Sequence, residues 1–360
     1  MGKPRICLIY TGGTIGMIKQ EDNTLRPPDH EEDFLRVAPE LGEVVVFDFV
    51  PLMNEDSSNM NPTDWTKIAQ SVYDRRNAGY DGFVIAHGTD TMHFSASAVA
   101  LALGDQLRFP VVFTGAQTIP EVRHGDARVN LLRACMVAST DIAEVVIAFG
   151  EYVFRGCRAQ KKDERRFDAF ESPAEFPLAY ITEEILIAPH AYLRNAKWKT
   201  GDIELRATFE SGVLQVSLIP GLEPELLRPI LESEACRGAI LQSFGAGNVP
   251  SREQYSFQTI IRRATELYKP IIITSQFPAN STLHSAYAAS KVAIGAGAIP
   301  TGNMTASCAA AKFRWVLAQV ESMIRAGDLN IDGKIAKVNE LMQHRFVGEV
   351  DKPQNGGHLT

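Results

Sequence analysis

Short runs of apolar, mostly β-branched residues alternate with helix-like segments along the first half of the chain. Such runs, bounded by polar turns, are typical of strands buried in a parallel sheet. They predict strands over residues 6–10, 44–50, 83–86, 110–114 and 145–149. Helices are expected after Thr91, over 126–138, and from Asn61, a good N-cap followed by Pro62 and by apolar residues at helical spacing. Strand–helix–strand units of this length imply parallel pairing through right-handed crossovers.

The pattern breaks between residues 151 and 176, which are rich in charge and lack periodicity. A polar stretch over 194–202 then predicts a linker, after which strands are expected over 213–219, 238–242 and 270–274. Ser251 with Gln254 is a capping-box pattern and predicts a helix before the last of these strands. A final helix is expected over 307–324, and the polar tail after Gly348 is expected to be disordered.

These patterns predict the α/β class, with a larger N-terminal parallel-sheet domain of flavodoxin-like type and a smaller C-terminal α/β domain. The chain has 360 residues, more than one hydrophobic core usually serves, which favours two domains. The expected boundaries are 1–190 for the N-terminal domain that carries the chemistry, 191–210 for a linker, 211–330 for the C-terminal domain and 331–360 for a C-terminal extension.

Net charge, apolar content and cysteine usage argue against several classes of protein. The net charge of -7 argues against a nucleic-acid or membrane-surface binder. No stretch approaches the roughly 20 apolar residues of a membrane helix, and the N-terminus has no signal-peptide pattern. The five cysteines are dispersed and form no CxxC pair, so we expect buried fillers in a reducing compartment rather than disulfides or a zinc site. The sequence therefore predicts a cytoplasmic protein.

Two polar clusters follow expected strands. Residues 11–16 (TGGTIG) follow the first strand, and residues 87–91 (HGTDT) follow the third. Because ligands of open α/β sheets bind beyond the carboxyl ends of the strands, we expect both clusters in one site. Thr14 would be the nucleophile there, with glycine N–H groups as oxyanion donors, or it would merely end a tight turn. Neither this segment nor residues 297–302 fits a dinucleotide or phosphate-loop fingerprint.

Several charged and hydroxyl groups accompany these clusters. Asp90 can pair with a ligand ammonium group or cap the next helix, and Thr89 offers a second hydroxyl. A lysine beside them could accept a proton, and spacing leaves Lys161 and Lys162 equally open. His87 suggests a base, although a histidine at a strand end is more often a structural hydrogen-bonding group.

One further pair of hydroxyls follows the second expected strand. Ser57 and Ser58 could bind a polar substrate, or they could serve ordinary turn chemistry.

His87 and His93 do not have the spacing of two ligands on one helix face, so no metal site is expected.

Together these motifs resemble the bacterial-type asparaginase/glutaminase family, and specifically its cytoplasmic type I L-asparaginases. The resemblance rests on residues 11–16, 56–58, 87–92, 114–117 and 167–173, and it extends from about residue 4 to about residue 325. It implies hydrolysis of L-asparagine to L-aspartate and ammonia, without cofactor or metal, by a homodimer or homotetramer. Activity on glutamine as well is an alternative that this sequence leaves open.

The resemblance also implies roles for individual residues. Thr14 would attack the side-chain amide to give an acyl-enzyme that water cleaves. Thr89, Asp90 and Lys161 would form a second group, with Lys161 matching the family lysine ahead of the Phe-Asp-Ala-Phe segment. Asp90 would hold the substrate α-ammonium and Ser57 would lie near the α-carboxylate. The substrate-binding set implied in this way is Asp56, Ser57, Ser58, Gly13 and Gly88.

One position departs from the family pattern. A tyrosine is often found on the mobile loop about ten residues after the nucleophile, and here Thr24 stands in the expected place. Tyr10 and Tyr73 are not obvious substitutes, so the sequence does not identify the group that activates Thr14. Some type I relatives bind asparagine at a second, interface site, for which the loop of residues 245–248 is a candidate.

Two other functions are compatible with the same scaffold. One is an amidotransferase subunit that deamidates a donor for charged transfer RNA. Such subunits carry an added N-terminal domain, and the first motif here begins at Thr11, which is expected to be too early to allow one. The other is a non-catalytic amino-acid sensor, against which the complete set of Thr14, Thr89, Asp90 and Lys161 speaks.

Overall fold

The computed structural model describes residues 2–277 and 288–351. Contacts divide the chain into two compact units, Met1–Thr208 and Phe209–Thr360. Both units are α/β, which confirms the expected fold class. The last residues of the tail expected to be disordered, 352–360, lie outside the described residues.

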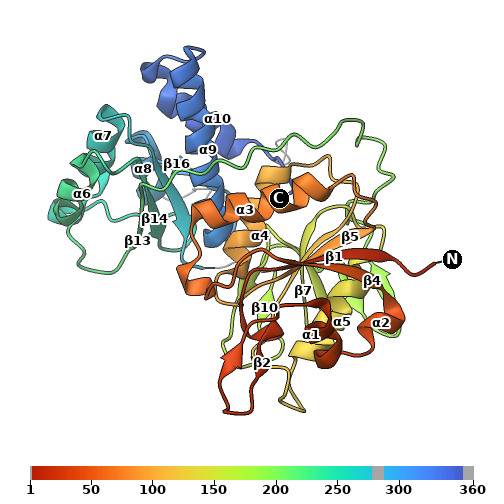
Figure 1. Ribbon diagram of the computed structural model, residues 1–360. Coiled ribbons are helices and arrows are strands. Elements are labelled where there is room, and N and C mark those ends of the chain that lie inside the picture. The colour runs from red at the N-terminus through yellow and green to blue at the C-terminus, as the bar shows by residue number, and fades with distance from the viewer. Residues whose placement is uncertain (1, 278–287, 352–360) are drawn as a thin grey trace, which may run out of the picture. The chain divides into compact units, whose positions relative to one another are not determined.

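The first unit is built on an eight-stranded sheet in the order β12-β11-β8-β7-β6-β5-β1-β4 (Figure 1). The strands β4, β1, β5, β6 and β7 are parallel neighbours, and β8, β11 and β12 add an antiparallel edge. The parallel strands follow the flavodoxin-like order, in which the first strand of the chain lies between the second and the third. The strands are β1 Arg5–Tyr10, β4 Val46–Pro51, β5 Gly82–Ala86, β6 Val111–Thr114, β7 Val145–Phe149, β8 Tyr152–Arg155, β11 Ala179–Ile181 and β12 Ile185–Ile187.

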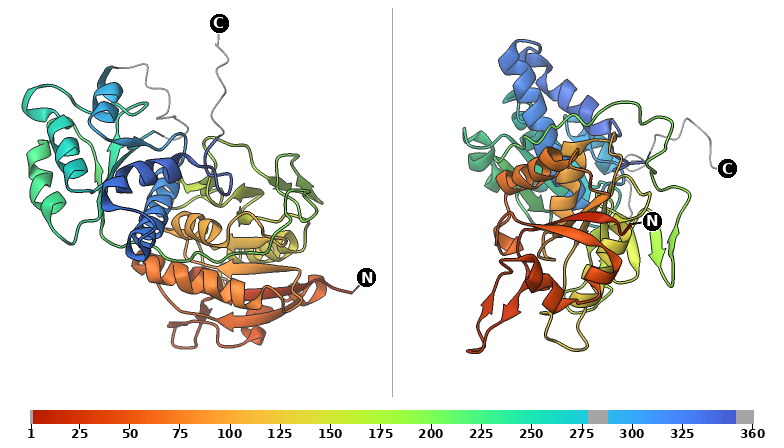
Figure 2. Two further views of the ribbon diagram at one scale, coloured as in Figure 1. Left: turned by 90° about the horizontal axis from the view of Figure 1, so that it is seen from above. Right: turned by 45° about the vertical axis from the view of Figure 1, so that its right-hand side comes forward.

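Helices cover both faces of this sheet (Figures 1 and 2). On one face α5 packs against β5, β6 and β7, and on the other α3 packs against α4, which contacts β6 and β7. Every residue of β5, β6 and β7 is therefore buried, which explains why these strands are continuous apolar runs in the sequence. The helices are α1 Glu31–Val37, α2 Leu41–Val44, α3 Pro62–Arg75, α4 Met92–Leu103 and α5 Ala127–Ala138, with short 3-10 turns at η1 Thr14–Gly16 and η2 Ser57–Asn59.

The helix α3 begins as the sequence predicts. The Asn61 side chain accepts a hydrogen bond from Thr63 N, and the Asp64 carboxylate accepts one from Asn61 N, which completes a capping box around Pro62. The second strand starts later than expected, because α2 extends to Val44 and pairing with β1 begins at Val46.

The charged segment expected to be irregular contains short strands. One hairpin, formed by β9 Gln160–Lys161 and β10 Phe170–Glu171, carries Lys161. A second hairpin, formed by β2 Ile18–Lys19 and β3 Leu25–Arg26, follows the first polar cluster. Strands of two residues are too short to leave a period in the sequence.

The polar stretch over 194–202 does not separate the two units, because it lies within the first. Lys199 is buried, and its ammonium group donates to the carbonyls of Asp105 at 2.9 Å, Ala143 at 2.7 Å and Leu107. Arg194 donates to the Thr140 carbonyl at 2.8 Å. Long cationic side chains that look solvated in the sequence thus attach this segment to the unit.

The second unit has a four-stranded parallel sheet in the order β13-β14-β15-β16. Buried residues of α7 pack with those of β14 and β15 in one core, and α9 contacts β15. Its strands are β13 Val213–Ser217, β14 Gly238–Ser243, β15 Ile271–Ser275 and β16 Ile299–Pro300. Its helices are α6 Arg228–Glu232, α7 Gln258–Glu266, α8 Ala288–Gly295, α9 Ala306–Ala326 and α10 Lys334–Gln343, with 3-10 turns at η3 Pro224–Leu227, η4 Glu253–Tyr255 and η5 Ile331–Gly333.

The capping box expected at Ser251 and Gln254 is wrong. Glu253 has a φ of 51°, a left-handed conformation that cannot continue into a helix, and only the 3-10 turn η4 forms there. The helix α7 begins at Gln258, and its N-cap residue Phe257 makes no side-chain cap but is fully buried in the core.

The helix expected to be the last, α9, is followed by α10, which packs on it. The chain then continues into a buried ion pair between Lys312 of α9 and Glu349, at 2.7 Å with both side chains fully buried. Lys312 also donates to the Met342 and His344 carbonyls, and Glu349 accepts from the Val347 N–H. Residues up to Val350 are therefore packed rather than disordered.

This ion pair yields a stability prediction. Glu349→Ala should lower the free energy of unfolding by about 3–5 kcal/mol, because it leaves the Lys312 ammonium buried without its partner. Urea unfolding followed by circular dichroism measures the change. The double variant Lys312→Met with Glu349→Leu should recover most of the loss, and a loss below about 1 kcal/mol in Glu349→Ala would contradict the assignment.

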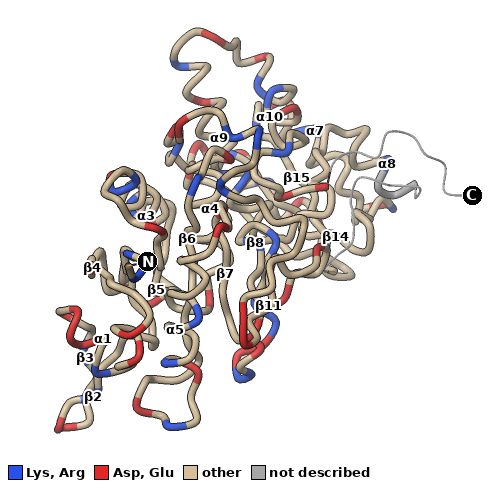
Figure 3. Tube along the Cα trace, turned by 90° about the vertical axis from the view of Figure 1, so that its right-hand side faces the viewer, with Lys and Arg blue, Asp and Glu red and all other residues tan. Residues whose placement is uncertain are grey.

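Acidic and basic residues are interspersed along the trace of each unit (Figure 3). Over residues 2–277 and 288–351, no helix combines the length and the apolarity that crossing a membrane requires. All five cysteines are buried, as expected of small fillers.

Candidate active site

The two polar clusters meet at the carboxyl ends of the neighbouring strands β1 and β5. The chain leaves β1 towards α1 and α2 and leaves β5 into α4, so the strand order reverses at this point. Such a reversal opens a crevice in which doubly wound sheets bind ligands. The Thr11 N–H donates to the Ala86 carbonyl at 3.0 Å and ties the two strand ends together.

Two glycines allow the loops to touch. Gly13 has a φ of 86°, and a Cβ atom placed on it would lie 2.6 Å from Gly88 N. A Cβ on Gly88 would lie 2.7 Å from the Ser57 hydroxyl oxygen. Both positions therefore require glycine for the three loops to pack together.

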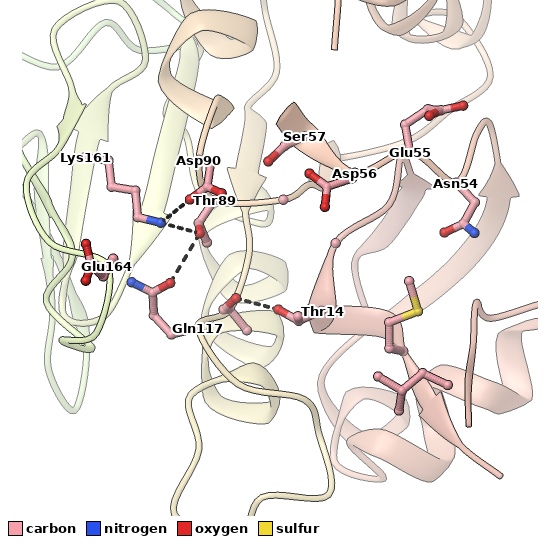
Figure 4. A pocket seen from close by; sticks show the side chains of 15 residues that line it. Thr14, Asn54, Glu55, Asp56, Ser57, Thr89, Asp90, Gln117, Lys161 and Glu164 are labelled. Atoms are coloured by element: carbon pink, nitrogen blue, oxygen red, sulfur yellow. Dashed lines mark hydrogen bonds and ion pairs between the residues drawn. The ribbon is translucent and has the colours of Figure 1, made fainter. Parts of the chain in front are cut away.

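A cavity of about 550 Å³ opens where these loops meet (Figure 4). Of the expected site residues, Ser58 alone does not line it; the exposed Ser58 hydroxyl instead donates to the Asp56 carboxylate at 2.7 Å. The lining consists of Gly13, Thr14, Met17, Leu25, Asn54, Glu55, Asp56, Ser57, Gly88, Thr89, Asp90, Ala116, Gln117, Lys161 and Glu164.

Lys161, Thr89 and Asp90 form one hydrogen-bonded group on a wall of the cavity (Figure 4). Lys161 Nζ donates to Thr89 Oγ1 at 2.8 Å and to Asp90 Oδ1 at 2.6 Å. The neighbouring Lys162 turns away and lies 3.6 Å from the Asp168 carboxylate. The structure thus separates two lysines that spacing left equivalent.

Thr14 lies across the cavity from Lys161 (Figure 4). It is in the turn η1, and its Oγ1 donates to the Ala116 carbonyl oxygen at 2.6 Å. A carbonyl holds the hydroxyl in one orientation but does not remove its proton. The hydroxyl-bearing residues of the two clusters, Thr14 and Thr89, therefore line a single cavity.

The hairpin after Thr14 contributes one apolar side chain, Leu25, to the cavity lining, and no phenol. Thr24 is exposed, and its hydroxyl donates to the Asp22 carboxylate at 2.6 Å, while the next residue, Leu25, lines the cavity. Tyr10 is buried behind the turn, with its hydroxyl 3.3 Å from both Gly13 O and Asn54 Oδ1. Neither Thr24 nor Tyr10 is among the residues lining the cavity.

Comparison with known proteins assigns the family. Residues 5–192 match the family described as Asparaginase, N-terminal, and residues 212–326 match the Glutaminase/Asparaginase C-terminal domain. The chain belongs to the asparaginase family. The resemblance inferred from the motifs is confirmed.

Two solved asparaginases share the fold over nearly the whole chain. The thermostable L-asparaginase from Thermococcus kodakarensis superposes with a TM-score of 0.84 at 26% identity, covering 96% of this chain and 99% of its own. L-asparaginase I from Vibrio cholerae gives a TM-score of 0.82 at 29% identity, with 97% and 100% covered. By sequence, a glutamyl-tRNA(Gln) amidotransferase subunit from Methanothermobacter thermautotrophicus is 30% identical, covering 97% of this chain and 77% of the relative.

The histidines of this asparaginase-family site are structural neighbours rather than cavity groups. Burial lowers the pKa of His87 to about 4, partly offset by its hydrogen bond to the Gly88 carbonyl. Burial, followed by the charge of Lys161, lowers the pKa of His93 to about 4 as well. Both rings are therefore neutral at pH 7 and neither lines the cavity. Within the described part of the chain, no three His, Cys, Asp or Glu side chains cluster as metal ligands.

Several cavity residues received no role from the sequence. Gln117 belongs to the segment 114–117, one of those that carry the family resemblance. It follows β6, the parallel strand next to β5, so its position after a strand could have predicted that it lies in the site. Asn54 and Glu55 lie in the loop that follows β4 and carry the same signal. Glu164 lies in the β9–β10 turn, for which the sequence holds no comparable signal.

Proposed function

We propose that this chain hydrolyses L-asparagine to L-aspartate and ammonia through a threonine acyl-enzyme. The observation that carries the proposal is that one cavity of the family fold holds Thr14 on one side and the hydrogen-bonded Lys161, Thr89 and Asp90 on the other. We further propose a cytoplasmic homodimer or homotetramer that uses no cofactor.

The first step forms an ester. Thr14 Oγ bonds to the side-chain amide carbon, the carbon–nitrogen bond breaks, and the hydroxyl proton leaves with the nitrogen as ammonia. Water then adds to the same carbon, the ester bond breaks, and a proton returns to the Thr14 oxygen. The Thr14–Ala116 hydrogen bond at 2.6 Å fixes the direction from which the hydroxyl approaches its substrate.

The remaining groups bind and orient the substrate. The Asp90 side chain is 68% exposed and uses Oδ1 for Lys161, which leaves its other oxygen for the substrate α-ammonium group. Ser57, which lines the cavity and whose side chain lies against Gly88, binds the α-carboxylate. Lys161 and Thr89 serve the proton transfers of the second step.

Substrate preference gives the direct test of this proposal. Ammonia release measured side by side should give a kcat/KM for L-asparagine at least about tenfold above that for L-glutamine, because one methylene is worth roughly 1–3 kcal/mol in a fitted pocket. A higher value for glutamine would favour a glutaminase. Saturable asparagine binding in calorimetry without any ammonia would favour a sensor.

A second function is favoured by the relative named as an amidotransferase subunit. A subunit of that kind would release ammonia efficiently only with its assembly and the charged transfer RNA. The purified chain alone is expected to turn over asparagine at full rate. Strong stimulation by added glutamyl-tRNA and cell extract, on a negligible basal rate, would support the amidotransferase instead.

A further inference from the structure

Thr14 and Thr89 both donate hydrogen bonds to the loop that follows β6. Among the described residues, no other segment of the cavity wall accepts from both. Thr14 Oγ1 donates to the Ala116 carbonyl at 2.6 Å, and Thr89 Oγ1 donates to Oε1 of Gln117 at 3.2 Å. The loop therefore orients both hydroxyl protons from adjacent residues.

The orientation of the Gln117 amide is fixed by its partners. Nε2 lies 3.2 Å from the Asp163 carbonyl oxygen and 3.4 Å from that of Arg166. Carbonyl oxygens only accept, so the amino group must face them and Oε1 must face Thr89. Thr89 consequently gives its proton to Gln117 and presents a lone pair to Lys161 Nζ at 2.8 Å.

The same amide joins two separate parts of the site. Residues 163–166 lie in the turn between β9 and β10, the hairpin that carries Lys161. The backbone of the β6 loop is held in turn by the buried Asp126 carboxylate, which accepts from Gln117 N at 2.9 Å and from Thr118 N at 3.1 Å. Gln117 thus connects an anchored loop, the hydroxyl of Thr89 and the hairpin of Lys161.

We propose that Gln117 is a positioning residue that sets the proton direction of Thr89 and the place of Lys161 for the second step of amide hydrolysis. This rests on the proposed function. Without Gln117, Thr89 can rotate and Lys161 loses its fixed acceptor, so kcat falls. KM changes less, because Asp90 and Ser57 carry the substrate contacts.

Gln117→Glu tests this through pH. A protonated Glu can accept from Thr89 and donate to the Asp163 carbonyl, whereas a carboxylate repels both carbonyl oxygens and draws Lys161 away from Thr89. The ratio of variant to wild-type kcat should therefore fall at least about tenfold from about pH 5 to about pH 8. The charged groups near position 117 are Asp90, Asp126, Lys161, Asp163, Glu164 and Arg166. They are present in both proteins, so the ratio reports the added carboxylate together with its effect on these neighbours.

Two further variants complete the test. Gln70→Glu makes the same change at an exposed position of α3 and should give a ratio that is flat with pH. Gln117→Asn keeps an uncharged amide that is too short for all three partners, and should lower kcat about tenfold with KM within about threefold and no pH trend. Thermal unfolding confirms that each variant is folded.

The outcomes separate this inference from the proposed function. An active wild type with a pH-independent Gln117→Glu ratio near one, and an unchanged kcat in Gln117→Asn, would overturn the role of Gln117 alone. A wild type that releases no ammonia from either amide would overturn the proposed function, and the role of Gln117 with it.

Discussion

Replacing Thr14 with alanine is expected to lower kcat for asparagine roughly 10⁴–10⁶-fold, the range seen when a nucleophile of an acyl-transfer enzyme is removed. No other hydroxyl occupies the turn η1, and Thr89 is committed to Lys161 and Gln117 across the cavity. The fold should persist, because the substitution removes one hydrogen bond, to the Ala116 carbonyl, worth about 1 kcal/mol. Steady-state ammonia release and thermal unfolding measure the two effects.

Thr24→Ala is the matched control, because it removes a threonine hydroxyl from the hairpin that follows. That hydroxyl bonds to Asp22 and does not line the cavity, so kcat should stay within about twofold of wild type. Thr14→Ser should retain part of the activity. Undiminished turnover in Thr14→Ala would remove Thr14 from the mechanism, and an equal loss in Thr24→Ala would transfer the effect to the hairpin.

Lys161→Met should lower kcat by about 10²–10⁴-fold, the usual contribution of a proton-transfer group. The substitution keeps the aliphatic stem but removes the donor that contacts both Thr89 and Asp90. KM should also rise, because Asp90 loses the partner that fixes its carboxylate. Initial rates over a wide asparagine range separate the two effects.

The neighbouring lysine provides the control for this prediction. Lys162→Met removes the same charge one residue away, where the ammonium group faces Asp168 outside the cavity. Its kcat and KM should remain close to wild type. Equal losses in the two variants would show that hairpin charge, rather than contact with Thr89, determines the rate.

The parts of the fold that the sequence predicts well are those set by burial. Strands such as 145–149 are enclosed on both faces, so their apolar runs define them, and β7 has the same bounds. The cap of α3 is equally local, since Asn61 and Asp64 bond to neighbouring backbone.

Other elements depend on distant contacts. The capping-box pattern at Ser251 is overridden by the backbone turn at Glu253 and the burial of Phe257. The segment around Lys199 looks like a linker until its carbonyl partners, more than fifty residues away, are known. The end of the second unit is held by Glu349, whose partner Lys312 lies on another helix.

In the candidate site, too, some residues could be predicted from local sequence and others depend on distant contacts. Thr14, Thr89 and Asp90 follow strands that are adjacent in the sheet, so their positions at strand ends suffice to predict a shared site from the sequence alone. The residues alone left Lys161 and Lys162 equally open, and only the family resemblance selected Lys161, because their hairpin has no periodicity. The role of Gln117 depends on bonds to residues 28 and more than 45 positions away, which a single sequence does not reveal.

Competition between water and hydroxylamine tests the covalent threonine intermediate most directly. If asparagine passes through a Thr14 ester, added hydroxylamine should divert product from aspartate to β-aspartyl hydroxamate in proportion to its concentration, with one ammonia released per product formed. Thr14→Ala should form neither product at a comparable rate. Aspartate as the only product at every hydroxylamine concentration, at an unchanged rate of ammonia release, would contradict the account.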